Sequence, residues 1–445
     1  MKHIATKLLD VFLEGSTRRK AGRLAAQDRR ILFVYDPAFL AGGLEISPFR
    51  LPLRPGTAAG NRDVFDGLFG VFNDSLPDGW GRLLLDRAVE KLGIARGELT
   101  PLDRLAHVGG HGMGALSYEP DKSGSHSATA ALKLDALAKD ASVVLAGDEG
   151  PVVEKLLKLN GASSGARPKI VAQVSGDKKR IIHGPEALLG GFSHWIIKFP
   201  ATVDSADIGP VEYAYSVMAR EAGLDMPDTH LFGAKKKYFG IKRFDRDGNR
   251  RIHMHSLSGL LHADHRVASL DYDAFLKATY VVTKDISQLE KAFRLACFNV
   301  LAHNRDDHAK NVSFLMDDAG RWVLAPAYDL TFSFGPGGEQ TMTVMGEGKQ
   351  PGVQQLRALG EKHALRNSPA IIGQVQSAVA RWQDHADQAG VTVKSAKLIA
   401  GKIAPPAMKP AAAKPAKKKS AAKTSSAKKT AREPAKRRSP KARKK

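Results

Sequence analysis

A polar segment, Asn304–Asn311, constrains the fold of this 445-residue chain more than any other feature, because two different hydrophobic patterns flank it. Before it, apolar residues recur at spacings of three and four from Ile286 to Val300, which predicts a helix. After it, two short apolar runs surround an Asp-Asp-Ala-Gly turn at 317–320, which predicts a β-hairpin. The polar segment should therefore be a loop that joins a helix to a rigid hairpin.

Three side chains in and beyond this loop have the order of a phosphoryl-transfer site. Asp306 precedes Asn311 by five residues, and Asp329 follows the hairpin, although the usual His-Arg-Asp and Asp-Phe-Gly wording is absent. Phosphoryl transfer needs an acid near the attacking hydroxyl and ligands for Mg²⁺, because it consists mostly of positioning and charge neutralisation. We predict that Asp306 is the catalytic base, and that Asn311 and Asp329 hold Mg²⁺ from opposed ends of the hairpin. ATP is then the first ligand to consider.

Asp307 is the alternative catalytic base, because it stands next to Asp306. The five-residue interval to Asn311 favours Asp306 instead. We therefore interpret Asp307 as a carboxylate that structures the loop. Replacing Asp306 by Ala or Asn should then abolish phosphoryl transfer while ATP binding and folding survive.

A glycine- and serine-rich turn further upstream has the composition of a phosphate-binding loop. It begins near Gly161 and leads into two strand patterns, at 170–174 and 180–183. Glycine lets backbone amides approach phosphates closely, and Arg167 and Lys169 add positive charge. The predicted contacts of this turn with ATP are Ser164, Gly165, Ala166, Arg167, Pro168 and Lys169.

A lone lysine, Lys198, lies in the apolar strand pattern 194–200 and would be costly to bury without a partner. The helix predicted over 211–222 carries Glu212 near its start. The two residues could recreate the lysine–glutamate pair that orients the α- and β-phosphates of ATP in kinases. Lys198 could equally be a surface lysine on an edge strand.

Two segments that follow carry less specific signals. The end of a hairpin pattern contains Lys242, Arg243 and Phe244, where a kinase hinge would contact adenine through its backbone. Four histidines come next, but nearby carboxylates and cysteines form no recognisable ligand set, so we interpret a solvated histidine-rich segment rather than a metal site. These histidines are His253, His255, His262 and His265.

Most of the formal net charge of +22 is concentrated in a tail. Residues 405–445 carry 16 Lys and Arg against one Glu, and contain no Leu, Ile, Val or aromatic residue. Such a segment cannot bury enough apolar surface to offset its chain entropy, so we predict disorder. Lysine and arginine at this density should bind nucleic acid through its phosphates, and the alternative is a solubilising tail.

The rest of the composition predicts where in the cell the protein is located. It has no amino-terminal apolar segment and no run near the ~20 apolar residues that span a bilayer, so we expect a cytoplasmic protein without a membrane partner. The basic tail adds the nucleoid as a second location. The single cysteine, Cys297, excludes an intrachain disulfide, and we interpret it as an inert buried thiol in the helix before the loop.

Taken together, these motifs resemble the HipA family of serine/threonine kinase toxins from bacterial type II toxin–antitoxin systems. The resemblance spans most of residues 28–395. Each motif alone is weak, but their combination and order are specific. The segments that carry it are Asn73–Gly79, Gly165–Lys169, Ile197–Pro200, Lys242–Arg246, Asn304–Asn311 and Leu324–Leu330.

The resemblance implies a two-lobed, protein-kinase-like α+β fold with a small amino-terminal α/β subdomain. We predict this subdomain over 1–125, and residues 121–150 look like a connector. A region like a kinase N-lobe, with the phosphate loop and hinge, should follow over 150–284. A helical region like a C-lobe, with the catalytic loop, should span 285–403, before the tail at 404–445.

The resemblance also implies an activity and its partners. Lys198 would bind ATP phosphate, and the predicted ATP contacts include His308, Lys310 and Tyr328 from the quoted motifs. Family members phosphorylate proteins, with aminoacyl-tRNA synthetases as known substrates, and a DNA-binding helix-turn-helix antitoxin typically holds them in check.

Autophosphorylation of a serine in the phosphate loop is a further expectation from the family. A serine is common there at the position that Ala162 occupies in this chain. Ser163 or Ser164 would have to serve instead. Two alternatives to the protein kinase remain: a nucleic-acid-associated regulatory protein that uses its basic tail, and a small-molecule phosphotransferase.

Overall fold

The computed structural model describes residues 4–124, 129–147, 151–161, 165–183, 187–267 and 269–403. Within these ranges the chain forms antiparallel sheets and helices, in agreement with the predicted α+β fold class. No helix there is long and apolar enough to cross a membrane. The predicted autophosphorylation sites Ser163 and Ser164 and the tail 404–445 lie outside the described residues.

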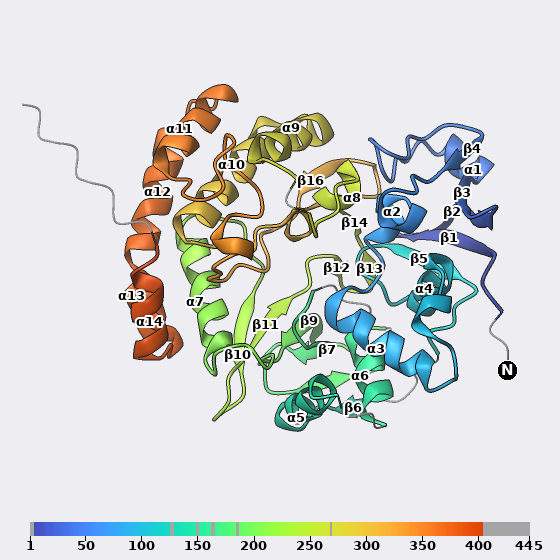
Figure 1. Ribbon diagram of the computed structural model, residues 1–445, viewed down its shortest axis with the longest axis horizontal. Helices are drawn as coiled ribbons and strands as arrows, with labels where there is room; N and C mark the ends of the chain where they lie inside the picture. Colours follow the sequence, from blue (N-terminus) through green and yellow to red (C-terminus); the bar gives the residue numbers. More distant parts are fainter. Residues whose placement is uncertain are drawn as a thin grey trace, which may run out of the picture. The chain divides into compact units, whose positions relative to one another are not determined.

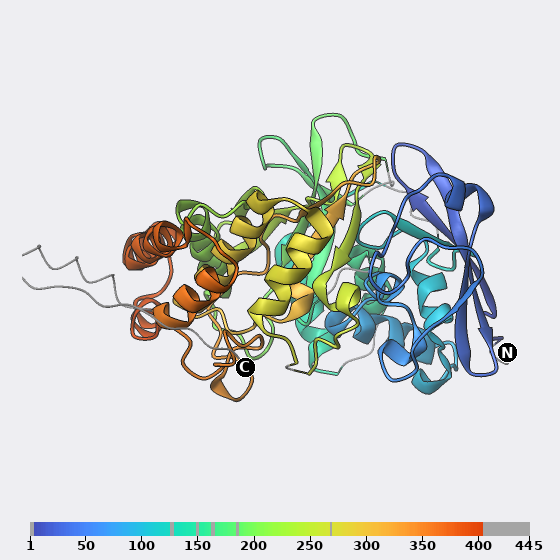
Figure 2. The same cartoon turned by 90° about the horizontal axis from the view of Figure 1, so that it is seen from above.

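A five-stranded antiparallel sheet opens the chain, with the strand order β4-β3-β2-β1-β5. Buried apolar residues alternate with exposed or half-buried residues along β1, which is the pattern of a sheet with one face on the core. Helix α4 (Pro101–Val108) packs against this sheet, as Figure 2 shows for the cyan helix beside the blue strands. The strands are β1 (Leu8–Glu14), β2 (Arg18–Gln27), β3 (Arg30–Tyr35), β4 (Thr57–Ala59) and β5 (Leu116–Glu119).

Helix α3 (Gly79–Glu90) connects this first unit to a second hydrophobic core. Trp80 and Leu84 on α3 are buried in a cluster with Trp195 and Ile197 of the second sheet. The short helix α2 (Gly70–Asn73) precedes α3. The loop between the two helices is therefore held at the boundary between the two cores.

The second sheet is antiparallel and has the strand order β10-β11-β9-β7-β8-β6. Strand β7 pairs with β9 in a register that places Lys169 opposite Lys198. Helix α7 (Ile208–Glu221) packs on β10 and β11. The strands are β6 (Ala130–Ala131), β7 (Lys169–Ser175), β8 (Ile181–His183), β9 (Phe192–Lys198), β10 (Thr229–Phe232) and β11 (Tyr238–Lys242).

The segment predicted to be a connector, 121–150, contains a helix. Helix α5 (Leu134–Leu145) buries Leu137, Ala141 and Val144 in the core of the second sheet. It packs beside α6 (Val152–Asn160). The Ser, Ala and Asp content suggested a linker, but leucines and valines at spacings of three and four give α5 an apolar face.

The predicted helix, loop and hairpin around Asn304–Asn311 are present. Helix α10 (Ile286–Leu301) delivers the chain to the loop, and β15 (Ser313–Met316) pairs antiparallel with β16 (Trp322–Leu324). Cys297 on α10 is buried, and its burial raises the pKa of its thiol, as expected for an inert residue.

Helices complete the carboxy-terminal region, as predicted. Figure 1 shows α7 in green beside α12 and α13 in orange, and these helices contact one another. The remaining elements are α1 (Pro37–Ala41), β12 (Arg246–Asp247), β13 (Arg250–Arg251), β14 (His253–Ser256), α8 (Leu257–Leu261), α9 (Tyr272–Thr283), α11 (Val353–Lys362), α12 (Ser368–Ala380), α13 (Trp382–Ala389) and α14 (Val393–Ala400).

The prediction of a solvated histidine segment is wrong for the two histidines of β14. His253 and His255 are both buried. His253 Nε2 lies 2.9 Å from the carbonyl oxygen of Ile46, and His255 lies between Asp74 and Ser47. Partners from the amino-terminal unit, distant in sequence, explain why these polar rings can be buried.

Candidate active site

A cavity of about 660 Å³ collects most of the predicted site residues. The loop between α2 and α3, from the amino-terminal unit, also lines this cavity. Arg167 and Pro168 are not among its lining residues, and Ser164 lies outside the described part of the chain. The predicted residues that line the cavity are Gly165, Ala166, Lys169, Lys198, Lys242, Arg243, Phe244, Asp306, His308, Lys310, Asn311, Tyr328 and Asp329.

Asn311 and Asp329 lie at the same end of the hairpin, so the prediction of opposed ends is wrong. An antiparallel hairpin returns its last residue to its first, and here Ala325 N donates to Ser313 O. The Tyr328 hydroxyl fixes this open end, because it lies 2.7 Å from both Ser313 Oγ and Lys310 O. Asp329 itself has a left-handed backbone, with φ of 57°. Such a strained position is typical of functional loops.

Lys198 is an interior lysine with two carboxylate partners. Its strand lies between β11 and β7, so the alternative of an edge-strand surface lysine is wrong. Its Nζ pairs with Asp329 and lies 3.0 Å from Glu212 Oε2. Burial by itself would lower the pKa of Lys198, but Asp329 and Glu212 together raise the pKa above its ordinary value. The predicted lysine–glutamate pair is thus present, and the lysine is charged.

Two further cations extend this network. Arg167 pairs with Glu212 at 2.7 Å, so it acts on the cavity through Glu212 rather than as part of its wall. Lys169 is buried beside Lys198, and burial lowers its pKa to about 8. Burial by itself would raise the pKa of Asp329. The positive charges of Lys198, Lys169 and Arg167 outweigh burial and hold this pKa well below its usual range. The wall of the cavity therefore combines an ionised carboxylate with several cations.

Asp306 faces the cavity with 57% of its side chain exposed. Its partial burial raises its pKa, and repulsion from Asp329 acts in the same direction. His308 Nε2 lies 3.8 Å from Asp306 Oδ1. The side-chain amide of Asn311 donates to the backbone oxygen of Asp306 at 2.9 Å, which fixes the two predicted site residues relative to each other.

Asp307 points away from the cavity and into the protein. Its carboxylate accepts hydrogen bonds from the hydroxyl of Tyr272 at 2.7 Å, the amide of Gln340 at 3.0 Å and the backbone N–H of Thr341 at 2.8 Å. Burial raises its pKa to about 6. These contacts agree with the prediction that Asp307 structures the loop, and they leave Asp306 as the accessible carboxylate.

The predicted hinge lies where β11 ends. The backbone N–H of Arg243 donates to His194 O at 2.8 Å, and its buried guanidinium pairs with Asp245 at 2.6 Å. The Phe244 ring lies 5.4 Å from the Tyr328 ring. Lys242 is exposed. The side chains of Arg243 and Phe244 thus have partners within the protein, and adenine binding by this segment stays a prediction.

Sequence reasoning missed two acidic residues of the site. Asp74 accepts hydrogen bonds from His255 and from the backbone and hydroxyl of Ser256, which joins the amino-terminal unit to β14. Asp78 contacts both Gly165 of the predicted phosphate loop and Lys310. The segment Asn73–Gly79 was part of the family resemblance, but its local pattern gave neither carboxylate a role.

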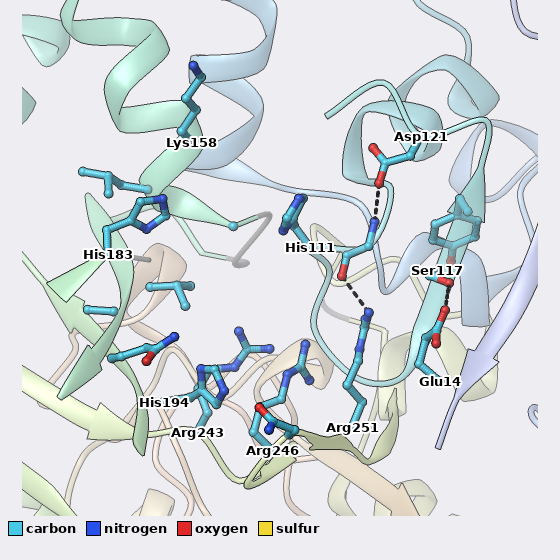
Figure 3. A pocket seen from close by; sticks show the side chains of 18 of the residues that line it. Glu14, His111, Ser117, Asp121, Lys158, His183, His194, Arg243, Arg246 and Arg251 are labelled. Atoms are coloured by element: carbon cyan, nitrogen blue, oxygen red, sulfur yellow. Dashed lines mark hydrogen bonds between the residues drawn. The ribbon is translucent and has the colours of Figure 1, made fainter. Parts of the chain in front are cut away.

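A second cavity, of about 530 Å³, is also lined by Arg243 (Figure 3). Two of its arginines bind main-chain oxygens, while Arg18 pairs with Glu14 and Glu119. Arg251 donates to the carbonyls of Gly110, Gly114 and Leu116 at 2.6 to 2.9 Å, and Figure 3 shows the first of these bonds. Arg246 likewise donates to Gly114 O. The bonds of Arg246 and Arg251 hold the segment 110–116 in place.

Comparisons with known proteins agree with this architecture. The model of the HipA-like C-terminal domain matches residues 161–399, and the model of the HipA N-terminal domain matches residues 9–119. The fold defines a protein of the HipA type. Since the C-terminal domain model covers more than half of the chain, the chain belongs to the HipA family.

Solved structures add a likeness of fold. HipA from Shewanella oneidensis MR-1, described in a complex of HipA, HipB and operator DNA of a toxin–antitoxin system, matches with a TM-score of 0.65 and 17% identity. The match covers 88% of this chain and 94% of that chain. The proinflammatory kinase CtkA from Helicobacter pylori matches with a TM-score of 0.31 and 13% identity over 48% of this chain and 94% of that chain. That score is too low to support an argument.

Proposed function

We propose that this chain is an ATP- and Mg²⁺-dependent serine/threonine protein kinase that acts as the toxin of a toxin–antitoxin pair. One observation carries the proposal. Lys198, Asp306, Asn311 and Asp329 come from a strand, a loop and the end of a hairpin, and they line one cavity. Lys198 is charged and paired with Glu212, as phosphate orientation requires.

The residues of the cavity fit Mg²⁺ and ATP. Asp329 and Asn311 offer the hard oxygen ligands that Mg²⁺ prefers, and Mg²⁺ commonly takes one or two protein ligands together with phosphates and water. The described residues contain no group of three or more His, Cys, Asp or Glu side chains that could hold a metal by themselves. When bound, Mg·ATP supplies the γ-phosphoryl group and neutralises its charge.

Each side chain of the network then has a defined task. Lys198 orients the phosphates, and Glu212, which also pairs with Arg167, holds Lys198 in place. Asp306 accepts the proton of the attacking hydroxyl. Its raised pKa favours this task, because a base works best when its pKa approaches the pH of the reaction. The backbone of Lys242–Phe244 would receive the adenine.

The finer parts of the proposal concern substrates and partners. A protein involved in translation, such as an aminoacyl-tRNA synthetase, is the substrate class that the family implies. A helix-turn-helix antitoxin is the proposed partner, supported by the description of the Shewanella protein in complex with HipB and operator DNA. We also propose autophosphorylation at Ser163 or Ser164, and nucleic-acid binding by the basic tail, from sequence alone.

Transfer of label from ATP tests the proposal. The purified chain is incubated with Mg²⁺, γ-labelled ATP and a cell extract, and labelled proteins are identified with their phosphorylated residue. We expect label on serine or threonine of a protein. With Asp306→Asn the transfer rate should fall by about a thousandfold, within the range for loss of a general base, while ATP affinity changes little.

A matched control is Asp317→Asn in the hairpin turn, which lies outside the cavity and pairs with Arg321. This variant should transfer label at the wild-type rate. Label only on small molecules would favour a phosphotransferase of another class. Wild-type rates in Asp306→Asn would refute the assignment of the base.

A further inference from the structure

The loop between α2 and α3 ends inside the candidate active site. There, the carboxylate of Asp78 bridges two donors from different parts of the chain. Oδ1 accepts a hydrogen bond from the backbone N–H of Gly165, and Oδ2 pairs with Lys310 Nζ at 2.6 Å. Gly165 belongs to the predicted phosphate loop, and Lys310 lies between Asp306 and Asn311. One side chain of the amino-terminal unit thus links both halves of the site.

Backbone contacts reinforce this link. The N–H of Trp80 donates to the carbonyl oxygen of Gly165 at 3.1 Å, so Gly165 is held on both of its polar groups. Gly79, with φ of 40°, brings the two segments together: a Cβ at this position would lie 2.5 Å from the Cα of Ala166. Only glycine tolerates this combination of backbone angle and close approach.

The burial of the bridge makes it strong. The side chains of Asp78 and Lys310 are 23% and 8% exposed. Burial acts to raise the pKa of Asp78, but Lys310 and the N–H of Gly165 outweigh it and lower the pKa. Asp78 is therefore ionised, and charge-assisted hydrogen bonds of this kind are shorter and stronger than neutral ones.

We propose that Asp78 is a positioning residue of the nucleotide site, which fastens the phosphate loop to the catalytic loop. This inference rests on the proposed kinase function and deepens it: the amino-terminal unit is part of the machinery that binds the phosphates of ATP. A carboxylate accepts hydrogen bonds on both of its oxygens, whereas a side-chain amide has only one acceptor oxygen. Asp78→Asn can therefore satisfy Gly165 N–H or Lys310, but not both.

The test compares ATP with adenosine, which lacks the phosphates. In Asp78→Asn we expect KM and Kd for Mg·ATP to rise about tenfold, as for the loss of a charge-assisted hydrogen bond. The affinity for adenosine should stay within about twofold, because the hinge backbone is not involved. The kcat should change less than KM, because Asp306 remains in place.

A second variant shows whether the bridge itself is responsible. Lys310→Met added to Asp78→Asn removes one of the two donors, so the amide can serve Gly165 N–H alone. The fold-increases of Kd for Mg·ATP are measured in Asp78→Asn, in Lys310→Met and in the double variant. We expect the increase in the double variant to be smaller than the product of the two single increases, because the two side chains interact directly. The matched control is Asp103→Asn, a buried carboxylate of the same unit that caps α4 and lies outside the cavity. It should leave KM for Mg·ATP unchanged.

The outcomes separate the two ideas. If the wild-type chain neither binds Mg·ATP nor transfers phosphate, the proposed function fails. If the wild type is active and Asp78→Asn has the same KM, or loses adenosine and ATP equally, the positioning role is wrong. Additive effects of the two substitutions also overturn it.

Discussion

The two cavities of this chain are similar in size, at about 660 and 530 Å³, and both are rich in charged side chains. Their charges are used differently. In the first cavity, lysines pair with carboxylates across elements that are distant in sequence: Lys198 with Asp329, and Lys310 with Asp78. In the second, Arg251 donates to four carbonyls of the segment 110–116, and Figure 3 shows one of these bonds.

This difference separates charged groups that a ligand could engage from charged groups that fix a loop. An ion pair such as that of Lys198 with Asp329 can be exchanged for a ligand of suitable charge, whereas the Lys310–Asp78 pair and the hydrogen bonds of Arg251 to main-chain carbonyls hold loops in place. Neither volume nor net charge separates the two cavities. The partners of Lys198 and of Arg251 do differ, and substitutions of these two residues should therefore affect different properties.

Lys198→Met is expected to have the largest effect on phosphoryl transfer among three substitutions that test this comparison. It removes the cation between Glu212 and Asp329. Loss of a charge-assisted contact costs about 1.5–3 kcal/mol, so kcat/KM should fall by roughly 10- to 100-fold. Steady-state kinetics with an identified protein substrate measure this fall.

Lys237→Met is the control for this prediction. Lys237 is an exposed lysine beside β11 of the same sheet, and it donates to the carbonyl of Gly233. Its replacement should leave kcat/KM within about twofold, as for ordinary surface substitutions. Equal losses in the two lysine variants would contradict a special role of Lys198.

Asp307→Asn should reduce phosphoryl transfer much less, by about tenfold at most, because Asp307 supports the loop without reaching the cavity. Its pKa in the folded protein, raised to about 6, also predicts a pH effect on stability. The stability contributed by its protonation is fully present below the unfolded pKa, near 4, and is lost as pH rises through 6. Urea unfolding between pH 4 and 7 measures this slope.

In Asp307→Asn this part of the slope should disappear, since the amide does not titrate. A loss of transfer as large as that of Asp306→Asn would instead make Asp307 the base. An unchanged slope would show that other groups cause the pH dependence.

The loop Asn304–Asn311 and its flanks could be predicted from sequence because local patterns determine them. The apolar spacing of α10 and the turn of the β15–β16 hairpin fix where Asp306 and Asn311 fall along the chain. The Lys198–Glu212 pair could also be predicted from sequence, since a lysine inside an apolar strand needs a partner. The family motifs then supplied the order of the parts.

The contacts of Asp78 and the burial of His255 could not be predicted in this way. Asp78 meets residues that are 87 and 232 positions away, and His255 meets Asp74 at a separation of 181. Local periodicity carries no information about such pairs. Asn311 and Asp329, by contrast, lie at the same end of the hairpin because its two strands are antiparallel. This placement follows from strand geometry and could be predicted from sequence.

Arg251→Ala should have the smallest effect on phosphoryl transfer and a clear effect on stability. It deletes the donors that hold the carbonyls of Gly110, Gly114 and Leu116, so the free energy of unfolding should fall by about 2 kcal/mol. The KM for Mg·ATP should stay within about twofold. Urea unfolding and kinetics on the same preparation measure the two quantities.

Arg250→Ala, which removes surface ion pairs with Asp247 and Asp318, is the matched control and should cost less than about 1 kcal/mol. A tenfold rise in KM for Arg251→Ala at unchanged stability would show that the second cavity, too, belongs to the nucleotide site.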